Sequence, residues 1–291
     1  YGLVGSEMCI RDSYTDYKDM LAGEDIDAVG VCTPNYLHAK MTVDCCRAGK
    51  YVLVEKPVAT SLPEVKRMKA AAKEAGVFIM AEQAHRFTPF TEKAHEVMAS
   101  GFMGKVLGFH ARVGSRGPVN WSPNGKWFYR KAEAFGGALA DIGIHIIDAV
   151  RWVTGLEIES VQAMTAHISK KGDVDDNGVL AVKASSGAIG SIEASWTQGP
   201  GYFGYEIVCE KGTLVAGMGR GVRAAMIEPA GEVEFTLAKS SVRGGPFKYF
   251  ADCVLNRQKP FVDINEGGKS LAVVIAAYRS AATGRAVAVK Y

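Results

Sequence analysis

The sequence predicts two units of different architecture: an α/β unit built on a parallel sheet, followed by an α+β unit with an open, largely antiparallel sheet and helices. In the first unit, short apolar runs alternate with segments of helical spacing, in the order strand, helix, strand, helix, strand. That order implies parallel strands joined by right-handed crossovers. In the second unit, several strand-like segments follow one another without intervening helices, which favours antiparallel pairing.

The elements expected in the first unit lie between residues 28 and 81. Apolar runs predict buried strands at 28–32, 51–54 and 77–81. Helical spacing predicts helices at 37–48 and 62–75, and a glycine follows each of them, Gly49 and Gly76. Glycine often takes the left-handed conformation just after a helix, so both helices are expected to end there.

After residue 86 the pattern changes to that of the second unit. Strands are expected at 106–113, 161–167, 178–184, 188–196, 205–210 and 233–237. Helices are expected at 89–100, 138–153, 247–255 and 266–283. The sequence therefore predicts a first domain over 14–86 and a second domain over 87–291.

Composition favours a small-molecule partner. The 291 residues are 48% apolar and 22% charged, which allows a full core. With 34 basic and 31 acidic side chains and no run of five like charges, the chain shows no charge pattern for nucleic acid or a membrane surface. We therefore expect neither as a partner.

Hydropathy and cysteine usage point to the cytoplasm. No apolar stretch approaches the roughly 20 residues that a transmembrane helix needs, and the start lacks the basic-then-apolar order of a signal peptide. The six cysteines form no Cys-x-x-Cys pair and lie mostly in apolar runs. We expect them to be reduced and structural, because buried thiols act as small hydrophobic side chains.

The first candidate functional segment follows the strand at 28–32 and runs from Thr33 to His38. Asn35 is well suited to cap the next helix, and ligands of open α/β sheets bind at the carboxyl ends of the strands. Backbone N–H groups at the positive helix end would then face the ligand. The alternative is an ordinary strand-to-helix turn with a good cap.

The second candidate segment is Glu55, Lys56 and Pro57, directly after the strand at 51–54. Charged side chains at the end of a buried strand either lose hydration or line a crevice, and we favour the crevice. There, Lys56 can donate to a substrate hydroxyl and stabilise a developing alkoxide. A Glu–Lys pair on the surface is the alternative.

The third candidate segment is the helix at 138–153, which carries Asp141 and His145. At i, i+4 spacing these side chains are neighbours on one helix face. A carboxylate beside an imidazole favours the protonated ring and fixes its orientation, which suits a general base. The alternative is a pair that only stabilises the helix, by roughly a few tenths of a kcal/mol.

Taken together, the motifs resemble the Gfo/Idh/MocA oxidoreductase family, named for glucose–fructose oxidoreductase and inositol dehydrogenase. The resemblance runs from about Tyr14 to the end of the chain, and the ordered set is more specific than any single motif. The motifs are, in order, Thr33-Pro34-Asn35 with His38, Ala48-Gly49-Lys50, Glu55-Lys56-Pro57, Arg86-Phe87, and the stretch from Gly136 to Gly155 with Asp141 and His145.

The resemblance implies a partial Rossmann domain with a doubly wound parallel sheet, and hydride transfer between a sugar, inositol or related polyol and NAD or NADP. His145 would accept the proton, Lys56 would polarise the hydroxyl, and Asp141 would position the substrate or orient His145. The implied cofactor contacts are Thr33, Pro34, Asn35, His38, Glu55, Lys56 and Gln83. The expected substrate contacts are Arg86, Trp127, Arg130, Asp141 and His145, and no metal is expected.

The front of the family pattern is not found in this sequence. Members begin with a strand, a Gly-x-Gly-x-x-Gly turn, a helix and a second strand, and nothing before Tyr14 matches. Roughly 50–60 residues would hold these elements, so we expect the first domain to lack its first βαβ part. Residues 1–13 are expected to be a non-family scar. The residue that distinguishes NAD from NADP would lie in the absent part.

Other functions remain open at this point. One is a non-catalytic dinucleotide- or sugar-binding protein on the same fold, although Lys56, Asp141 and His145 argue against it; another is an inactive truncated fragment. A metal-dependent hydrolase built on His38, His110 and His145 is disfavoured, because no metal-ligand spacing appears. The open sheet of the second domain needs a cover, so a homodimer or homotetramer through that sheet is expected.

Overall fold

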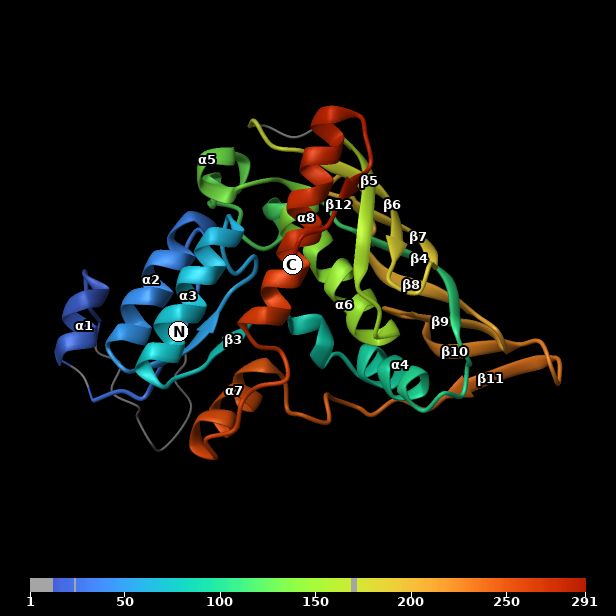
Figure 1. Ribbon diagram of the computed structural model, residues 1–291, viewed down its shortest axis with the longest axis horizontal. Helices are drawn as coiled ribbons and strands as arrows, with labels where there is room; N and C mark the ends of the chain where they lie inside the picture. The colour runs from blue at the N-terminus through green and yellow to red at the C-terminus, as the bar shows by residue number, and fades with distance from the viewer. Residues whose placement is uncertain (1–12, 24, 169–171) are drawn as a thin grey trace.

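The computed structural model describes residues 13–23, 25–168 and 172–291, and two sheets organise them (Figure 1). The smaller sheet has three strands in the order β1-β2-β3. The larger has nine strands in the order β11-β10-β9-β8-β4-β7-β6-β5-β12. The predicted fold class, a Rossmann-like parallel sheet followed by a largely antiparallel sheet with helices, is confirmed.

The first unit alternates helices and strands as expected. Its elements are α1 (Tyr17–Gly23), β1 (Ala28–Val31), α2 (Asn35–Arg47), β2 (Tyr51–Val54), α3 (Leu62–Ala75) and β3 (Ile79–Ala81). β2 pairs in parallel with β1 on one side and with β3 on the other. Gly49 and Gly76 follow α2 and α3 with φ of 74° and 69°, as predicted. The sequence did not predict α1.

The second unit is larger. It contains η1 (Ala84–Phe87), α4 (Pro89–Ala99), β4 (Val106–Gly114), η2 (Pro118–Asn120), η3 (Lys126–Tyr129), α5 (Lys131–Ala134), the π-helical η4 (Leu139–Gly143), α6 (Ile144–Thr154), β5 (Ile158–Ala166), β6 (Asn177–Ala184), β7 (Ile189–Ser195), β8 (Tyr202–Cys209), β9 (Gly212–Gly217), β10 (Gly221–Met226), β11 (Gly231–Phe235), α7 (Pro246–Leu255), α8 (Ile264–Thr283) and β12 (Val287–Ala288).

Pairing in the larger sheet is antiparallel except between β4 and β7, which run parallel. The sequence did not predict β9, β10 or β12. Glycines begin and end β9 and begin β10, and glycine in a strand pattern indicates a turn. Within the described ranges, no helix is both long and apolar enough to cross a membrane.

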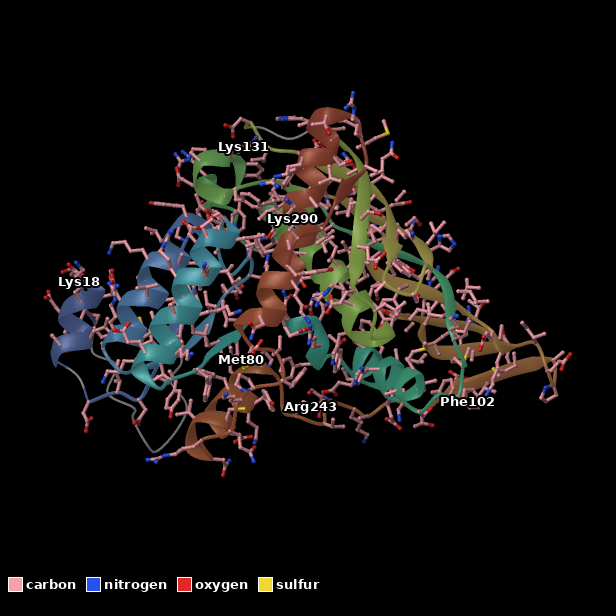
Figure 2. All side chains as sticks on the ribbon, viewed as in Figure 1. Lys18, Met80, Phe102, Lys131, Arg243 and Lys290 are labelled. Atoms are coloured by element: carbon pink, nitrogen blue, oxygen red, sulfur yellow. The ribbon has the colours of Figure 1, made fainter. Side chains whose placement is uncertain are left out.

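Helices cover one face of the larger sheet. α4, α6 and α8 pack on that face, and α8 also contacts α3 and β3, so it lies between the two units (Figure 1). Side chains crowd the space between these helices and the sheet (Figure 2). Along β6, buried residues alternate with exposed ones, so the core lies on the helical side and the other face is open.

The segment that leads into α6 depends on Asp175 and two glycines. Asp175 accepts hydrogen bonds from the backbone nitrogens of Gly137 (2.8 Å) and Leu139 (2.9 Å), and from the Tyr278 hydroxyl (2.6 Å). A Cβ on Gly137 would collide with the Asp175 carbonyl oxygen, and one on Gly136 would collide with the Tyr278 hydroxyl. Only glycine fits at either position without moving a neighbour.

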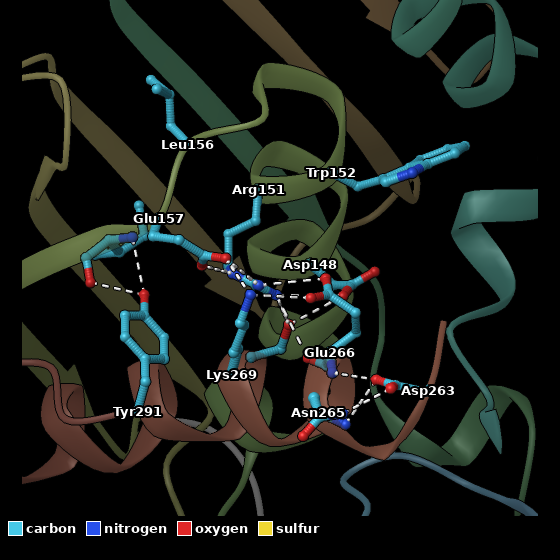
Figure 3. Close-up of polar contacts among 12 residues, drawn as sticks. Asp148, Arg151, Trp152, Leu156, Glu157, Asp263, Asn265, Glu266, Lys269 and Tyr291 are labelled. Atoms are coloured by element: carbon cyan, nitrogen blue, oxygen red, sulfur yellow. Dashed lines mark hydrogen bonds and ion pairs between the residues drawn. The ribbon is translucent and has the colours of Figure 1, made fainter. Parts of the chain in front are cut away.

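Buried ion pairs connect η1, α6 and α8, and Figure 3 shows the α6 and α8 side of this cluster. Arg86 donates to both carboxylate oxygens of Asp148, at 2.6 and 2.8 Å, and to Glu266 Oε2 at 2.9 Å. Arg151 donates to Glu157 Oε2 at 2.8 Å and lies 3.4 Å from Glu266 Oε2. The Arg86 side chain is only 1% exposed. It is therefore closed off from a substrate, and the substrate contact expected for Arg86 is not supported.

Breaking this cluster is expected to destabilise the fold strongly. Arg86→Leu leaves Asp148 buried without its bidentate partner, so the free energy of unfolding should fall by about 3–5 kcal/mol. Denaturant unfolding measures the loss. The control Lys93→Ala removes the more exposed Lys93–Glu96 pair and should cost about 1 kcal/mol or less. Similar losses in both variants would contradict this account.

The same cluster predicts acid sensitivity. Burial would raise the pKa of Glu266, but the hydrogen bond from Arg86 and the charges of Arg151 and Arg86 lower it to about 2. Because the folded pKa lies below the unfolded value, Glu266 stabilises the fold above its unfolded pKa of about 4.3, and this contribution is lost as the pH falls toward 2. Chemical unfolding across that range should therefore show a smaller acid loss in Glu266→Gln than in the unmodified chain. An equal loss in both proteins would show that Glu266 does not contribute.

Candidate active site

The candidate site lies where the three parallel strands end. Glu55 N donates to Val31 O at 3.0 Å, and Glu82 N donates to Val54 O at 2.8 Å. The residues that follow β1, β2 and β3 therefore stand side by side along one edge of the sheet. This carboxyl edge is the place where open α/β sheets bind their ligands.

Two side chains of the Thr33–His38 segment contact backbone carbonyl oxygens of the protein at this edge. His38 Nδ1 lies 2.8 Å from Pro57 O and its Nε2 lies 2.7 Å from Thr33 O, while burial lowers the pKa of the ring. Asn35 Nδ2 donates to Ala134 O at 2.8 Å. Pro34, not Asn35, is the N-cap of α2, so the predicted cap is wrong. Protein carbonyl oxygens lie against both His38 nitrogens, one of which donates in the neutral ring, and against the Asn35 amide nitrogen. This does not support the direct cofactor contacts expected for these two residues.

Lys56 links the first unit to the second. Its Nζ lies 2.6 Å from Asp141 Oδ1 and 2.8 Å from the Asp141 carbonyl oxygen, and both side chains are largely buried. Trp196 Nε1 donates to the other carboxylate oxygen, Asp141 Oδ2, at 3.2 Å. Asp141 thus holds Lys56 through Oδ1 and its backbone carbonyl oxygen, while Oδ2 holds Trp196.

His145 has different neighbours from those expected. The predicted Asp141–His145 pair is wrong, because Leu139–Gly143 is π-helical and Asp141 bonds to Lys56 and Trp196 instead. The wider turn shifts the faces that α-helical spacing predicts. His85 lies edge-on to His145, with ring centroids 4.9 Å apart, and stacks on Phe203 at 3.8 Å.

Burial keeps both histidines neutral at ordinary pH. It is the largest cause that lowers the pKa of His145 well below its usual value, and the positive charge of Lys56 acts in the same direction, as any protonation of His85 would. Burial and Lys56 lower the pKa of His85 to about 4, against a smaller opposite effect of Asp148. His145 makes no hydrogen bond within the described residues, and it is half-buried. A neutral imidazole that is free of protein partners can accept a proton.

Several buried polar atoms near this edge have no hydrogen-bond partner within the described residues. They are Thr33 Oγ1, both amide atoms of Gln83, His85 Nδ1 and His145 Nδ1. Buried polar groups normally have partners, so such atoms require an explanation. The Gln83 amide offers one donor and one acceptor, which matches the carboxamide of a nicotinamide ring. These residues therefore fit the cofactor that the resemblance implies.

Sequence reasoning missed three residues of this site: Glu82, His85 and Trp196. Burial raises the pKa of Glu82 to about 7, with a further contribution from the charge of Glu55. Its position directly after the third buried strand was a usable signal, the same one that identified Glu55 and Lys56. No comparable signal marked Trp196, which reaches Asp141 from beyond the end of β7.

Two predicted substrate contacts, Trp127 and Arg130, pack against near neighbours in sequence. The Trp127 ring stacks on Phe128 at 3.8 Å, and Arg130 pairs with Glu133 at 2.6 Å on an exposed side. These contacts do not lead to Lys56 or His145. Tyr129, which lies between them in sequence, packs edge-on against Trp196 instead, with centroids 6.0 Å apart.

Comparison with known proteins agrees with this arrangement. Residues 6–83 match the oxidoreductase family with an NAD-binding Rossmann fold, and residues 91–215 match the GFO/IDH/MocA C-terminal domain. A D-xylose 1-dehydrogenase (NADP(+)) of Haloferax volcanii is 30% identical, over 98% of this chain and 87% of that protein. A 1,5-anhydro-D-fructose reductase of Ensifer adhaerens is 28% identical, over 98% of this chain and 86% of that protein.

A solved structure gives the same result. GenD2 from gentamicin A biosynthesis, determined in complex with NAD, superposes with a TM-score of 0.82 at 30% identity, over 96% of this chain and 82% of that one. Sequence motifs, fold and relatives therefore agree. The chain belongs to the Gfo/Idh/MocA family and is an NAD(P)-dependent oxidoreductase that acts on sugar or polyol CH–OH groups.

Proposed function

We propose that Lys56, Asp141 and His145 are the catalytic residues of this oxidoreductase. The observation that supports this most is the Lys56 ammonium, held 2.6 Å from Asp141 Oδ1 near a neutral His145 that has no hydrogen-bond partner in the described chain. In the oxidative direction, His145 accepts the proton of the substrate hydroxyl. Lys56 donates to the same oxygen and stabilises the developing alkoxide, while Asp141 positions Lys56.

The cofactor is proposed to lie along the ends of β1, β2 and β3. Thr33, Pro34, Glu55 and Gln83 line this edge, and the unpartnered atoms of Thr33 and Gln83 support contact with the nicotinamide end. When bound, the nicotinamide supplies the hydride acceptor. Asn35 and His38 hold the turn in place through their carbonyl contacts.

The experiment that tests this proposal is titration of the chain with NADH and NADPH, followed by nicotinamide fluorescence. Binding of either cofactor, with turnover in a screen of aldoses, anhydrosugars and inositols, is the expected result. The screen also identifies the substrate within the sugar and polyol class. Cofactor binding without turnover of any substrate would favour a non-catalytic binding protein, and no binding of either cofactor would contradict the proposal.

Substitution of the catalytic groups is expected to lower turnover without unfolding the protein. His145→Ala removes the proton acceptor and Lys56→Met removes the hydroxyl donor, so each should lower kcat by about 100- to 10,000-fold. Steady-state kinetics with the best substrate measures the effect, and cofactor titration checks that binding survives. Lys73→Met, an exposed lysine on α3, is the matched control and should change kcat less than twofold. A near-normal kcat in His145→Ala would exclude it as the base.

The open face of the larger sheet is proposed to pair two copies of the chain, as a homodimer or within a homotetramer. Met164, Val179 and Ile189 stand exposed on neighbouring strands of this face, 79%, 51% and 69% exposed. Large apolar side chains gathered on one sheet face mark an association surface.

Sedimentation velocity tests this surface. The unmodified chain should sediment as a dimer or tetramer, and Val179→Asp should shift it toward monomer, because an unpaired charge would be buried at the contact. Leu255→Asp changes a residue on α7 that is 80% exposed and should leave the assembly unchanged. A monomer in the unmodified chain would rule out the proposed pairing.

A cytoplasmic location is also proposed. The five cysteines within the described residues, Cys32, Cys45, Cys46, Cys209 and Cys253, are free thiols. Free thiols persist in reducing compartments, whereas oxidising ones favour disulfides. Subcellular fractionation with a tagged chain provides the test.

A further inference from the structure

A row of acidic side chains crosses the carboxyl edge of the parallel sheet. The backbone hydrogen bonds that align Val31 with Glu55 and Val54 with Glu82 place Cys32, Glu55 and Glu82 next to one another at the ends of their strands. Glu82 is only 6% exposed. The backbones of Glu55 and Glu82 therefore stand side by side at the edge where the cofactor is proposed to bind, and the Glu55 charge acts on the Glu82 carboxyl.

This carboxyl pair has no cation of its own. The nearby ammonium of Lys56 is engaged by Asp141, at 2.6 Å to Oδ1 and 2.8 Å to the carbonyl oxygen. Glu55 Oε2 accepts only a backbone hydrogen bond, from Lys56 N at 3.1 Å. No ion pair among the described residues includes Glu55 or Glu82. Fully ionised, Glu55, Glu82 and Asp141 would place three negative charges around one ammonium.

Such an arrangement of carboxyl groups keeps one proton bound. Two neighbouring buried carboxyls cannot both ionise without strong repulsion, so one of them stays protonated to higher pH. Burial is the main cause that raises the pKa of both groups, and repulsion from Glu55 adds to the effect at Glu82. The charge of Lys56 and the backbone N–H groups of Lys56 and Ala84 oppose this rise without cancelling it, while Cys32, whose pKa is raised, stays a thiol and His85 is neutral.

We propose that the Glu55–Glu82 pair shares one proton in the free protein and releases it when the positively charged, oxidised nicotinamide ring binds beside it. This inference rests on the proposed position of the cofactor. A cationic ring next to the pair supplies the missing positive charge, so both carboxyls can ionise. The reduced ring is neutral and leaves the proton in place. The pair therefore distinguishes the two redox states of the cofactor by charge.

The proton balance closes over one oxidative turnover. Glu82 releases a proton when the oxidised cofactor binds. The substrate hydroxyl proton passes to His145, and the hydride passes to the ring, which becomes neutral. The pair then takes a proton back from solvent, and His145 gives the substrate proton to solvent, which completes the cycle. The net reaction is unchanged, because the proton released on binding equals the proton taken up after hydride transfer.

The first test measures the proton in the free protein. Nuclear magnetic resonance of isotope-labelled glutamate carboxyls should show one group that titrates near neutral pH, well above an ordinary glutamate, and it should be absent from Glu82→Gln. Glu74→Gln, an exposed residue on α3, is the matched control and should keep the signal. If every glutamate carboxyl titrates in the ordinary acidic range, the inference is wrong.

The second test measures the coupling to the cofactor, with NAD and NADH or with NADP and NADPH, whichever pair binds. As the pH falls from about 8 to about 6, affinity for the oxidised form should weaken roughly tenfold, while affinity for the reduced form stays nearly constant. Calorimetry in two buffers of different ionisation enthalpy should detect the released proton. In Glu82→Gln, both the pH dependence and the proton release should disappear.

The outcomes separate the two proposals. Binding of both redox states with no proton release, or with the same release in Glu82→Gln, would overturn the carboxyl-pair inference and leave the proposed function intact. Failure of all four nicotinamide cofactors to bind would overturn the proposed function and the inference with it.

Discussion

The bidentate ion pair between Arg86 and Asp148 determines how the catalytic elements meet. Arg86 directly follows His85 in η1, and Asp148 lies about one turn beyond His145 on α6. When the two charged groups join inside the protein, the two histidine rings come together, 4.9 Å apart. A buried charge pair is costly to desolvate and adds little net stability, but it is strongly specific about geometry. Here that specificity fixes the junction between η1 and α6, both in the second unit.

The Lys56–Asp141 pair builds on this junction. Lys56 leaves the first unit at the end of a parallel strand, whereas Asp141 belongs to the helical segment of the second unit. Once η1 and α6 are locked together, the ammonium can reach the carboxylate at 2.6 Å. Each unit thus supplies part of the proton-handling group, and neither unit contains a complete set.

The sequence predicted the residues at the strand ends better than their partners. Lys56 and Glu55 could be found because charged residues after a fully apolar run stand out, and the same reasoning would have found Glu82. Predicting the partner of Asp141 required knowledge that Leu139–Gly143 widens into a π-helix, which α-helical spacing does not reveal. Asn35 and His38 have residue types that suit a ligand site, but their polar atoms bond to carbonyls distant in sequence. Such long-range contacts depend on the tertiary fold, which local pattern does not specify.

The two glycines before α6 have a consequence for how this motif is interpreted. They carry no side chain and let Asp175 and Tyr278 approach the backbone closely, while the Gly137 carbonyl oxygen accepts a hydrogen bond from Asp141 N at 2.8 Å. Both positions therefore require glycine, because a Cβ would collide with these neighbours. This close approach sets the position of the following helix along its axis. A relative with a bulkier residue at either place would need a reshaped segment around Asp175 to keep its aspartate within reach of the lysine. In this fold, the glycine pair lets the chain pass close to Asp175, and this places the catalytic residues on the helical turns that follow.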